Sequence, residues 1–468
     1  AKATRWVPVN PGTEADLALG IAAVMVSRNM IDTGTVSGLS SWKSDLLAEY
    51  ATEKVSQTTG VAAEVIAELA KDFAGANRPL ALCGRGKAQT AGSLRDIAAV
   101  YALNALAGNI NQKGGMWPIP EADYILWPNV ATDNLASAGL SQPRIDGAGA
   151  GKYAQARYLA SRLADAVNGN GPYPLQVLLV ASANPCHDLP DTQRVKEAFA
   201  RIPFIVSFSS FHDETAAMAD LLLPDHVYLE RYEDVPVGAG LAQQMIGLSR
   251  PVVSPQFNTR HLGETLITAA KAMGEPMADA FPWDDYETCL EETLAEKWDT
   301  LMEDGVWVQA DIDPVGDTLQ LAGMDAEAVQ AEGDVNSFPL LLLPYDTIRL
   351  TSGYIGEAPF MIKTVADTVI KGNDGFVEVN PQTARAAGLG QGDMATLTTP
   401  RGEARVKIHL FEGIQPGVLA MARGLGHTAY DAFLAGKGVN INTLIGPVED
   451  PSSGHDAAWG IRATLSKA

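Results

Sequence analysis

The sequence predicts a mixed α/β protein in which two α/β units are followed by a closed β-barrel. In the first half of the chain, short apolar runs alternate with segments of helical periodicity, and this alternation recurs in a second unit. Such alternation is typical of a mainly parallel sheet. After a strongly acidic stretch, short β-rich runs follow one another between Gly and Pro turns from Phe338 onward, which favours a barrel.

The first α/β unit is expected over residues 1–150. Trp6–Val9 predicts a short strand, and the apolar run Pro79–Cys83 predicts a buried one. Helical spacing predicts helices over residues 14–29, 42–51, 62–74 and 92–107. Because the residues up to Val9 resemble the end of a βα unit, we expect the N-terminal part of this unit to precede Ala1.

The second α/β unit is expected over residues 151–274. Its strands are predicted at Gln176–Ala181 and Phe204–Ser207, and a further strand is predicted to begin near Ala219. Helices are predicted over residues 153–166, 191–200 and 214–219. We therefore expect a second parallel sheet whose loops carry polar residues at the strand ends.

Residues 275–337 form the acidic stretch, in which Lys297 is the only basic residue up to residue 334. Apolar residues at helical spacing predict one amphipathic helix there, followed by a solvated linker. Residues 338–468 form the predicted barrel, with one helix at 383–387. Barrel strands are predicted at residues 340–343, 347–351, 376–379, 394–399, 404–409 and 417–422.

Composition and charge restrict the class of protein. The 468 residues are 46% hydrophobic and carry a net charge of −22, which argues against nucleic-acid binding. The acidic surface either keeps the protein soluble or docks a cationic partner such as a basic cytochrome. No run of apolar residues is long enough to span a membrane, so we expect no direct membrane span.

The three cysteines, Cys83, Cys186 and Cys289, stand far apart, and no CxxC motif exists. An iron–sulfur cluster normally needs four clustered thiolates, so this chain supplies no complete cluster site. Buried, unreactive thiols are the simpler interpretation. We therefore predict no metal held by side chains of this chain.

Two candidate ligand sites lie at helix starts in the first unit. Thr13 and Glu14 open a helix after a strand, where a hydroxyl and a carboxylate suit the ribose or guanine edge of a nucleotide. The alternative is an ordinary capped helix. Gly84, Arg85 and Gly86 stand at the carboxyl end of a predicted strand, where α/β sheets bind ligands, although a plain βα turn has the same pattern.

Further polar motifs follow in the second unit and the barrel. Asn184-Pro185 comes directly after a buried strand, and the segment Ser207–Thr215 comes after the next one. It is followed by Leu223-Pro224 and Glu230. The barrel contains the glycine-rich turn Gly388–Asp393 and ends with the segments Gly424–His427 and Asn440–Asn442.

The order of these motifs resembles that of molybdopterin oxidoreductases of the dimethyl-sulfoxide-reductase family, over essentially the entire chain. The resemblance implies two doubly wound α/β domains around a pseudo-twofold axis, followed by a C-terminal double-psi β-barrel. In the family, a bis-molybdopterin guanine dinucleotide lies between these parts. The implied crevice residues are Thr13, Glu14, Gly84, Arg85, Gly86, Asn184, Ser209, Asp213, Glu214, Thr215, His427 and Asn442.

Within the family, the segments His212–Ala216 and Leu223–His226 and the pair Glu230-Arg231 resemble molybdopterin-like periplasmic subunits of menaquinone reductase complexes of sulfate reducers. That resemblance implies a subunit of a membrane-bound complex on the periplasmic side of the cytoplasmic membrane, which passes electrons from periplasmic donors to menaquinone. The implied partners are an iron–sulfur subunit, a multihaem cytochrome c subunit and an integral membrane quinone-binding subunit.

The resemblance leaves the cofactor and the chemistry open. In the subgroup the subunit is thought to have lost its cofactor, Glu14 stands where the family usually has Asp, and the metal ligand of the family would precede Ala1. We therefore expect no cofactor in this chain and no catalytic residue of its own. The alternative is a molybdenum or tungsten bis-pterin reductase acting on polysulfide, thiosulfate or tetrathionate; an unrelated α/β protein is the remaining possibility.

Overall fold

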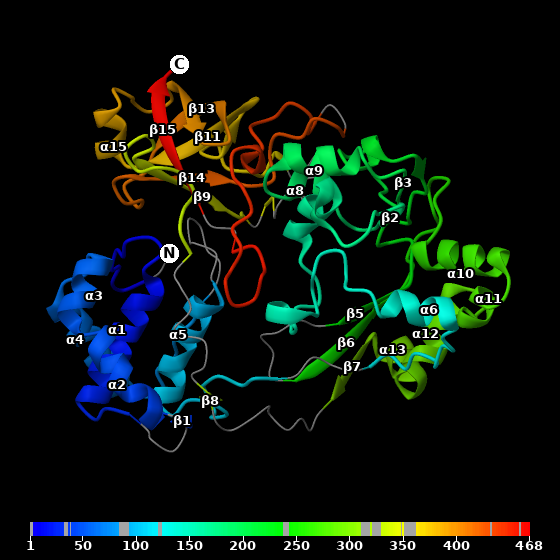
Figure 1. Cartoon of the computed structure of the whole chain (residues 1–468), viewed down its shortest axis with the longest axis horizontal. Coiled ribbons are helices and arrows are strands. Elements are labelled where there is room, and N and C mark those ends of the chain that lie inside the picture. The colour runs from blue at the N-terminus through cyan, green and yellow to red at the C-terminus, as the bar shows by residue number, and fades with distance from the viewer. Residues whose placement is uncertain are drawn as a thin grey trace.

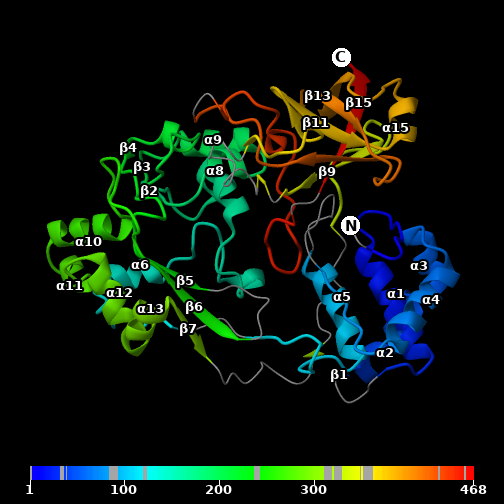
Figure 2. The same ribbon diagram turned by 180° about the vertical axis from the view of Figure 1, so that it is seen from behind.

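The computed structural model of the chain has three lobes (Figure 1). The N-terminal helices and the C-terminal barrel lie on one side, and the second α/β unit lies on the other. The view from behind shows the same arrangement (Figure 2). The structure describes residues 3–31, 36–37, 39–83, 93–119, 124–236, 243–309, 319–320, 329–347, 349–350, 362–430, 433–457 and 460–468.

The N-terminal lobe is built around one buried helix. Its helices are α1 (Glu14–Ser27), α2 (Leu39–Glu49), α3 (Thr52–Thr59), α4 (Ala63–Gly75) and α5 (Leu94–Leu106). Helix α1 is apolar on most of its circumference, and Leu19 and Met25 are fully buried. A helix that is apolar all round belongs in the centre of a bundle, and α1 packs against α3, α4 and α5.

Two strands that the sequence predicts in this lobe are not strands in the structure. Trp6–Val9 and Pro79–Cys83 have no strand partner, and Leu82 is 76% exposed. The side chain of Asn104 on α5 takes the place of a neighbouring strand: its Oδ1 accepts from the Ala81 N–H at 2.7 Å, and its Nδ2 donates to the Ala81 carbonyl at 2.8 Å. The prediction of a strand at Pro79–Cys83 is wrong because a side-chain amide here pairs with the backbone N–H and C=O groups that a neighbouring strand would otherwise bind. Local apolar spacing does not distinguish the two cases.

The second unit has the predicted parallel sheet, with strand order β2 (Val177–Val180), β3 (Phe204–Ser207) and β4 (Leu221–Leu222). Helices α8 (Pro185–Asp188) and α9 (Thr192–Phe199) follow β2, and the short η4 (Ala216–Met218) precedes β4. The helix predicted over 153–166 is broken into η1 (Gly151–Tyr153), η2 (Ala160–Arg162), α7 (Leu163–Asp165) and η3 (Ala166–Asn170). The break follows from Asp146, whose carboxylate binds the Leu159 N–H at 2.9 Å and so holds that residue outside a helix.

A small antiparallel sheet, β5 (Glu233–Pro236), β6 (Gln244–Ser249) and β7 (Val306–Gln309), extends this unit. Strand β7 lies where the sequence predicts a solvated linker, and it pairs with residues 244–247 of β6. The short alternation Val306-Trp307-Val308 is its only sequence signal. The adjoining helices are α10 (Leu262–Met273), α11 (Met277–Ala280), α12 (Tyr286–Leu294), η5 (Ala295–Lys297) and α13 (Trp298–Asp304).

The C-terminal lobe is a closed barrel, so the predicted fold class is confirmed. Its strands are β9 (Leu340–Tyr345), β10 (Ile370–Lys371), β11 (Asp374–Val379), β12 (Met394–Thr399), β13 (Gly402–Leu410), β14 (Val418–Ala422) and β15 (Ile461–Lys467). The order β11-β13-β12-β15-β9-β14 is closed by antiparallel pairing of β14 with β11. Helix α15 (Pro381–Ala386) follows β11, and η8 (Ile441–Thr443) precedes β15. A two-residue parallel pair, β1 (Val36–Ser37) with β8 (Leu319–Gln320), lies near the N-terminal helices.

No helix in the described part of the chain is both long and apolar enough to cross a membrane.

A buried ion pair joins α1 to α5, and we predict that it is needed for the stability of the N-terminal lobe. Arg95 donates to Asp16 at 2.9 Å and to the Tyr50 hydroxyl at 3.3 Å, and its side chain is 7% exposed. Replacing Asp16 with Asn leaves the guanidinium buried without its counter-charge, so we expect a loss of about 3 kcal/mol in unfolding free energy.

The measurement is native-state hydrogen exchange of the amides of α1 and α5. The matched control is Glu49→Gln, which removes the carboxylate of the exposed Glu49–Lys54 pair. Because exposed pairs contribute little, the control should exchange like the parent protein. Equal exchange in both variants would show that the buried pair contributes no more than a surface pair.

Candidate functional site

The predicted site residues of the second unit meet the barrel at one buried polar cluster. Asn184 follows β2, and Glu214 and Thr215 follow the adjacent strand β3, because the carboxyl ends of parallel strands lie at one edge of a sheet. His427 and Asn442 come from the loops between β14 and β15. We refer to these five residues, together with His187, as the Glu214 cluster.

Glu214 is the centre of the cluster and is 4% exposed. Its carboxylate accepts hydrogen bonds from Asn184 Nδ2 at 2.8 Å and His427 Nδ1 at 3.2 Å, and from the Thr428 and Ala429 N–H groups at 2.6 and 3.1 Å. Burial by itself would raise the pKa of Glu214, but the bonds from His427 and Asn184 outweigh it, so the pKa lies well below its ordinary value. The carboxylate is therefore ionised and ties the sheet edge to the barrel.

Asn184 organises the sheet-edge side of the cluster. Its Oδ1 accepts from the Thr215 hydroxyl at 2.7 Å and from the Thr215 N–H at 3.1 Å. The Thr215 hydroxyl oxygen in turn accepts from the Cys186 N–H at 3.1 Å. The start of α8 and the loop after β3 are thus held together by side chains, which fixes the position from which Glu214 reaches the barrel.

Two histidine rings stack between the sheet edge and the barrel. His187 on α8 and His427 have ring centroids 3.7 Å apart at an interplanar angle of 10°. His187 Nδ1 faces the Asp188 carboxylate at 2.8 Å, and its Nε2 faces the Leu425 carbonyl at 3.1 Å. Both partners only accept hydrogen bonds, so each pairs best with a ring nitrogen that donates.

The barrel loops also clamp the backbone of α8. Asn440 Nδ2 and Asn442 Nδ2 both donate to the His187 carbonyl, at 2.9 and 3.0 Å, and Asn442 also donates to the Asp188 carbonyl at 3.1 Å. These carbonyls belong to a four-residue helix, which has no following turn to satisfy them. The amides therefore cap α8 from the barrel.

Two buried polar atoms of the cluster, His427 Nε2 and Asn442 Oδ1, have no hydrogen-bond partner among the described residues. The two residues are 3% and 1% exposed. Buried polar atoms are almost always paired, so these two atoms indicate a partner group that the described residues do not supply. Asn442 Oδ1 can only accept, and His427 Nε2 also accepts in a neutral ring whose Nδ1 donates to Glu214, so a polar ligand that donates hydrogen bonds fits both atoms.

The structure does not bring every predicted site residue into this cluster. Ser209 lies nearby in sequence and donates to Asp213 at 2.9 Å, and Asp213 accepts from the Ala216 N–H at 2.7 Å, so this pair shapes the loop after β3. Thr13 and Glu14 lie apart, at the start of α1. There the Thr13 hydroxyl donates to the Asn10 carbonyl at 2.7 Å, and Glu14 accepts from the Gly12 N–H at 2.8 Å.

Gly84, Arg85 and Gly86, the predicted sheet-edge turn, lie outside the described residues. His187 and Asp188 are site residues that the sequence did not single out. Their signal was present, since they follow Asn184-Pro185 within the same loop, but an isolated His is more often structural than functional. What identifies His187 as a site residue is its stacking against His427, which is more than two hundred residues further along the chain.

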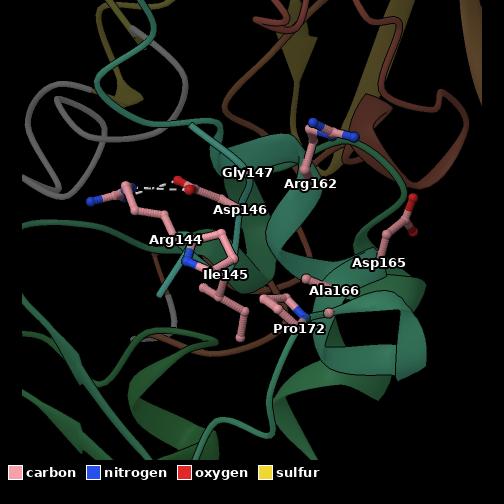
Figure 3. Close-up of a pocket in the computed structure, with 10 residues that line it drawn as sticks. Arg144, Ile145, Asp146, Gly147, Arg162, Asp165, Ala166 and Pro172 are labelled. Atoms are coloured by element: carbon pink, nitrogen blue, oxygen red, sulfur yellow. Dashed lines mark hydrogen bonds and ion pairs between the residues drawn. The ribbon is translucent and has the colours of Figure 1, made fainter. Parts of the chain in front are cut away.

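A pocket of about 470 Å³ lies elsewhere, between residues 143–147 and 162–172 (Figure 3). None of its lining residues is a predicted dinucleotide contact. Its charges are already compensated: Arg144 pairs with Asp146, Arg162 with Glu449 and Asp165 with Arg194. This pocket therefore offers a ligand no free charge, in contrast to the unpartnered atoms of the Glu214 cluster.

The chain belongs to the molybdopterin oxidoreductase family. It matches the family model "Molybdopterin oxidoreductase" over residues 1–264 and the model "Molydopterin dinucleotide binding domain" over residues 360–460. The second match contains His427 and Asn442, and the first contains Asn184 and Glu214. The Glu214 cluster thus joins the two matched regions.

Among relatives, the chain is 31% identical to the molybdopterin-binding-like subunit of menaquinone reductase from Nitratidesulfovibrio vulgaris, over 99% of this chain and 63% of that protein. It is 24% identical to the molybdopterin-containing subunits of arsenate respiratory reductase from Shewanella sp. and thiosulfate reductase from Salmonella typhimurium, covering 100% of this chain and 69% and 68% of those proteins. The chain therefore spans about two thirds of the length of these relatives.

Among solved structures, acetylene hydratase from Pelobacter acetylenicus has the same fold, with a TM-score of 0.76 and 18% identity, covering 100% of this chain and 72% of that one.

The expectation that this chain holds no cofactor is wrong. The matches to a molybdopterin oxidoreductase and to a dinucleotide-binding domain point to a molybdopterin cofactor in this chain. The expectation rested on the resemblance to a subgroup thought to have lost its cofactor, on Glu14 in place of the usual Asp, and on a metal ligand placed before Ala1. None of these concerns the residues at the sheet edge and in the barrel. A dinucleotide is bound by loop backbone and polar side chains, which the sheet edge and the barrel provide.

We predict that Glu214→Gln loosens the junction between the sheet edge and the barrel. The variant keeps the size of the side chain but removes the charge that four donors share, so hydrogen exchange at the Thr428 and Ala429 amides should accelerate by about 10- to 100-fold. Glu332→Gln, which weakens the half-exposed Arg401–Glu332 pair, is the matched control and should leave these amides unchanged.

The pH dependence has a definite sign. Because the pKa of Glu214 is lower in the folded protein, its stabilisation is complete above its ordinary value of 4.5 and is lost as the pH falls below that value. The difference in exchange between the parent protein and Glu214→Gln should therefore be constant from pH 8 to about pH 5 and shrink below it. A difference that grows on acidification would contradict the assignment.

Proposed function

We propose that this chain is the molybdopterin dinucleotide-binding subunit of a membrane-associated respiratory complex that passes electrons from periplasmic donors to menaquinone. The observation that carries the proposal is the pair of buried, unpartnered atoms, His427 Nε2 and Asn442 Oδ1, at the junction of the two regions that match molybdopterin families. The likeness to a menaquinone reductase subunit supports the complex and its quinone.

The residues of the cluster have separate roles in this proposal. Glu214 holds His427 by Nδ1, so that Nε2 is turned away from the carboxylate and is available to a ligand. Asn442 donates its amide N–H groups to the carbonyls of α8, so its Oδ1 can accept a hydrogen bond from the same ligand. Thr13, Glu14 and the turn at Gly84–Gly86 are proposed for the other dinucleotide.

When bound, a molybdopterin dinucleotide supplies a redox-active metal held by pterin sulfurs. The side chains of this chain bind and orient the dinucleotide and exclude water from it. An iron–sulfur subunit, a multihaem cytochrome c subunit and an integral membrane quinone-binding subunit would complete the electron path. The complex would lie on the periplasmic side of the cytoplasmic membrane.

A second candidate function is catalysis by a molybdenum or tungsten bis-pterin reductase on thiosulfate, tetrathionate or polysulfide. The likeness to a thiosulfate reductase subunit over all of this chain favours it. Both functions require the same dinucleotide contacts. They differ in the electron acceptor. In the first, the electrons pass to a quinone in another subunit, and in the second, they reduce a sulfur compound at the metal.

The test is isolation of the complex from membranes by an affinity tag on this chain. Acid hydrolysis should release guanosine monophosphate, iodine oxidation should give a fluorescent pterin, and the complex should reduce a soluble menaquinone analogue. Release of neither product would overturn the proposal. Thiosulfate reduction without menaquinone reduction would replace it with the second candidate.

We predict that His427→Ala and Asn442→Ala each lower the amount of dinucleotide that the purified chain retains. Losing one buried hydrogen bond to the ligand costs about 1.4 kcal/mol, which corresponds to about tenfold in affinity. The readout is released guanosine monophosphate per chain, which does not depend on activity. The control is His455→Ala, at an exposed histidine of the same lobe, which should retain the parent amount of dinucleotide. Equal retention in all three variants would show that His427 and Asn442 do not bind the dinucleotide.

A further inference from the structure

One segment of the second lobe is exposed along its whole length. Every residue from Leu126 to Arg144 is exposed, although the segment contains large apolar side chains. Trp127 is 63% exposed, and Leu135 and Leu140 are 81% and 76% exposed. Single exposed apolar residues are ordinary, but an uninterrupted exposed segment that carries several of them marks an interaction surface. We call residues 126–144 the exposed arm.

The exposed arm is held at both ends. At its start, Tyr124 is buried beside Ile246 and Leu290, and the Leu126 N–H donates to the Thr293 carbonyl at 2.8 Å. At its end, Asp146 is buried and accepts from the Ala148 and Leu159 N–H groups at 3.1 and 2.9 Å. The arm is therefore presented at a fixed place on the lobe.

Between these anchors the arm contains helix α6 (Asn134–Leu140), whose N-terminus is capped by the Asp133 side chain at 2.7 Å from the Ala136 N–H. The helix buries none of its residues. An isolated helix of this length is marginal in water, because most helical stability in proteins comes from packing an apolar face. The described residues provide no such packing for α6, so its packing partner lies outside them.

We propose that the exposed arm docks a separate protein subunit whose contact surface is apolar at its centre and basic at its rim. The apolar centre follows from the arm itself, in which Asp133 and Arg144 are the only charged residues. Interfaces have a centre depleted in charge, and tryptophan is enriched among the residues that dominate binding. Trp127, Leu135 and Leu140 are the expected anchors.

The basic rim of the partner is inferred from the acidic surface that lies beside the arm. Helix α6 lies next to α10–α13 in both views (Figures 1 and 2), and the start of the arm contacts α12 through Leu126 and Thr293. Lys297 on this surface is buried beneath the Trp307 ring, and Lys271 pairs with Asp284. The exposed acidic residues there are Glu275, Asp279, Asp284, Asp285, Glu287, Glu291, Glu292, Glu296, Asp299, Glu303 and Asp304.

A second copy of the chain does not suit this surface. Each copy carries a net charge of −22, and two copies that meet through their arms would bring their acidic helices together. A basic partner instead gains attraction on approach, which increases the association rate and makes it sensitive to salt. The charge therefore selects a different, cationic subunit over self-association.

This inference rests on the proposed function, because it names the place where a partner subunit of the complex binds. The complex isolated by a tag on this chain is compared with the isolated chain by hydrogen exchange of residues 126–144. We expect the amides of α6 to be at least about tenfold slower in the complex. Equal exchange in the two samples would overturn the inference, and so would protection that arises from dimers of the isolated chain.

The variant experiment uses Leu135→Glu together with Leu140→Glu, and Phe257→Glu as the matched control. Phe257 is 82% exposed and lies outside the arm and the acidic helices. The double variant should lower the amount of the arm-protecting subunit in the complex by at least about tenfold, and the control should not. A benzophenone cross-linker at residue 135 should join the arm to a peptide of that subunit rich in Lys or Arg.

The arm variants also separate this inference from the proposed function. The double variant should retain the parent amount of guanosine monophosphate, because the Glu214 cluster is untouched. Retained dinucleotide with lost subunit supports the inference, whereas a complete complex with the double variant overturns it and leaves dinucleotide binding in place. Replacing Glu291 and Glu292 with Lys should weaken association further at low salt, and an unchanged association rate would refute the basic rim.

Discussion

The contact between the second lobe and the barrel depends on the hydrogen bonds that one buried carboxylate accepts. Glu214 is buried, and a buried charge is tolerated only if donors surround it. Asn184 supplies one donor from its own lobe, and His427 and the backbone at Thr428 supply others from the barrel. The carboxylate is therefore stable only when the sheet edge and the barrel meet, and the stacked His187 and His427 fill the space beside it.

The same constraint explains why this junction suits a ligand. Once Glu214 and the backbone of α8 have taken their donors, His427 and Asn442 are fixed in orientation with one polar atom each left over. Rigid, unpaired groups in a buried setting bind a complementary ligand without reorganisation. The two family matches meet at this point, and a dinucleotide supplies donors of the required kind.

The exposed arm of the second lobe is proposed to have a different role from the dinucleotide crevice. The exposed arm carries its apolar side chains beside acidic helices and away from the Glu214 cluster, so partner binding and dinucleotide binding involve separate residues. The proposed function requires both, because electrons that enter or leave a buried cofactor must pass to a neighbouring subunit.

Periodicity in the sequence determined α1, α2, α4 and α5 of the N-terminal lobe, the parallel strands β2 and β3 and most barrel strands, because these depend on local apolar spacing. The mostly polar helix α3 has no such spacing and was not predicted. The order of motifs determined the family and pointed to Asn184, Glu214 and His427. Only the tertiary structure decided that Pro79–Cys83 is satisfied by Asn104 and that β7 joins a sheet. It also placed His187 against His427 and left the arm exposed. These features depend on which distant residues meet, and local spacing carries no information about such contacts.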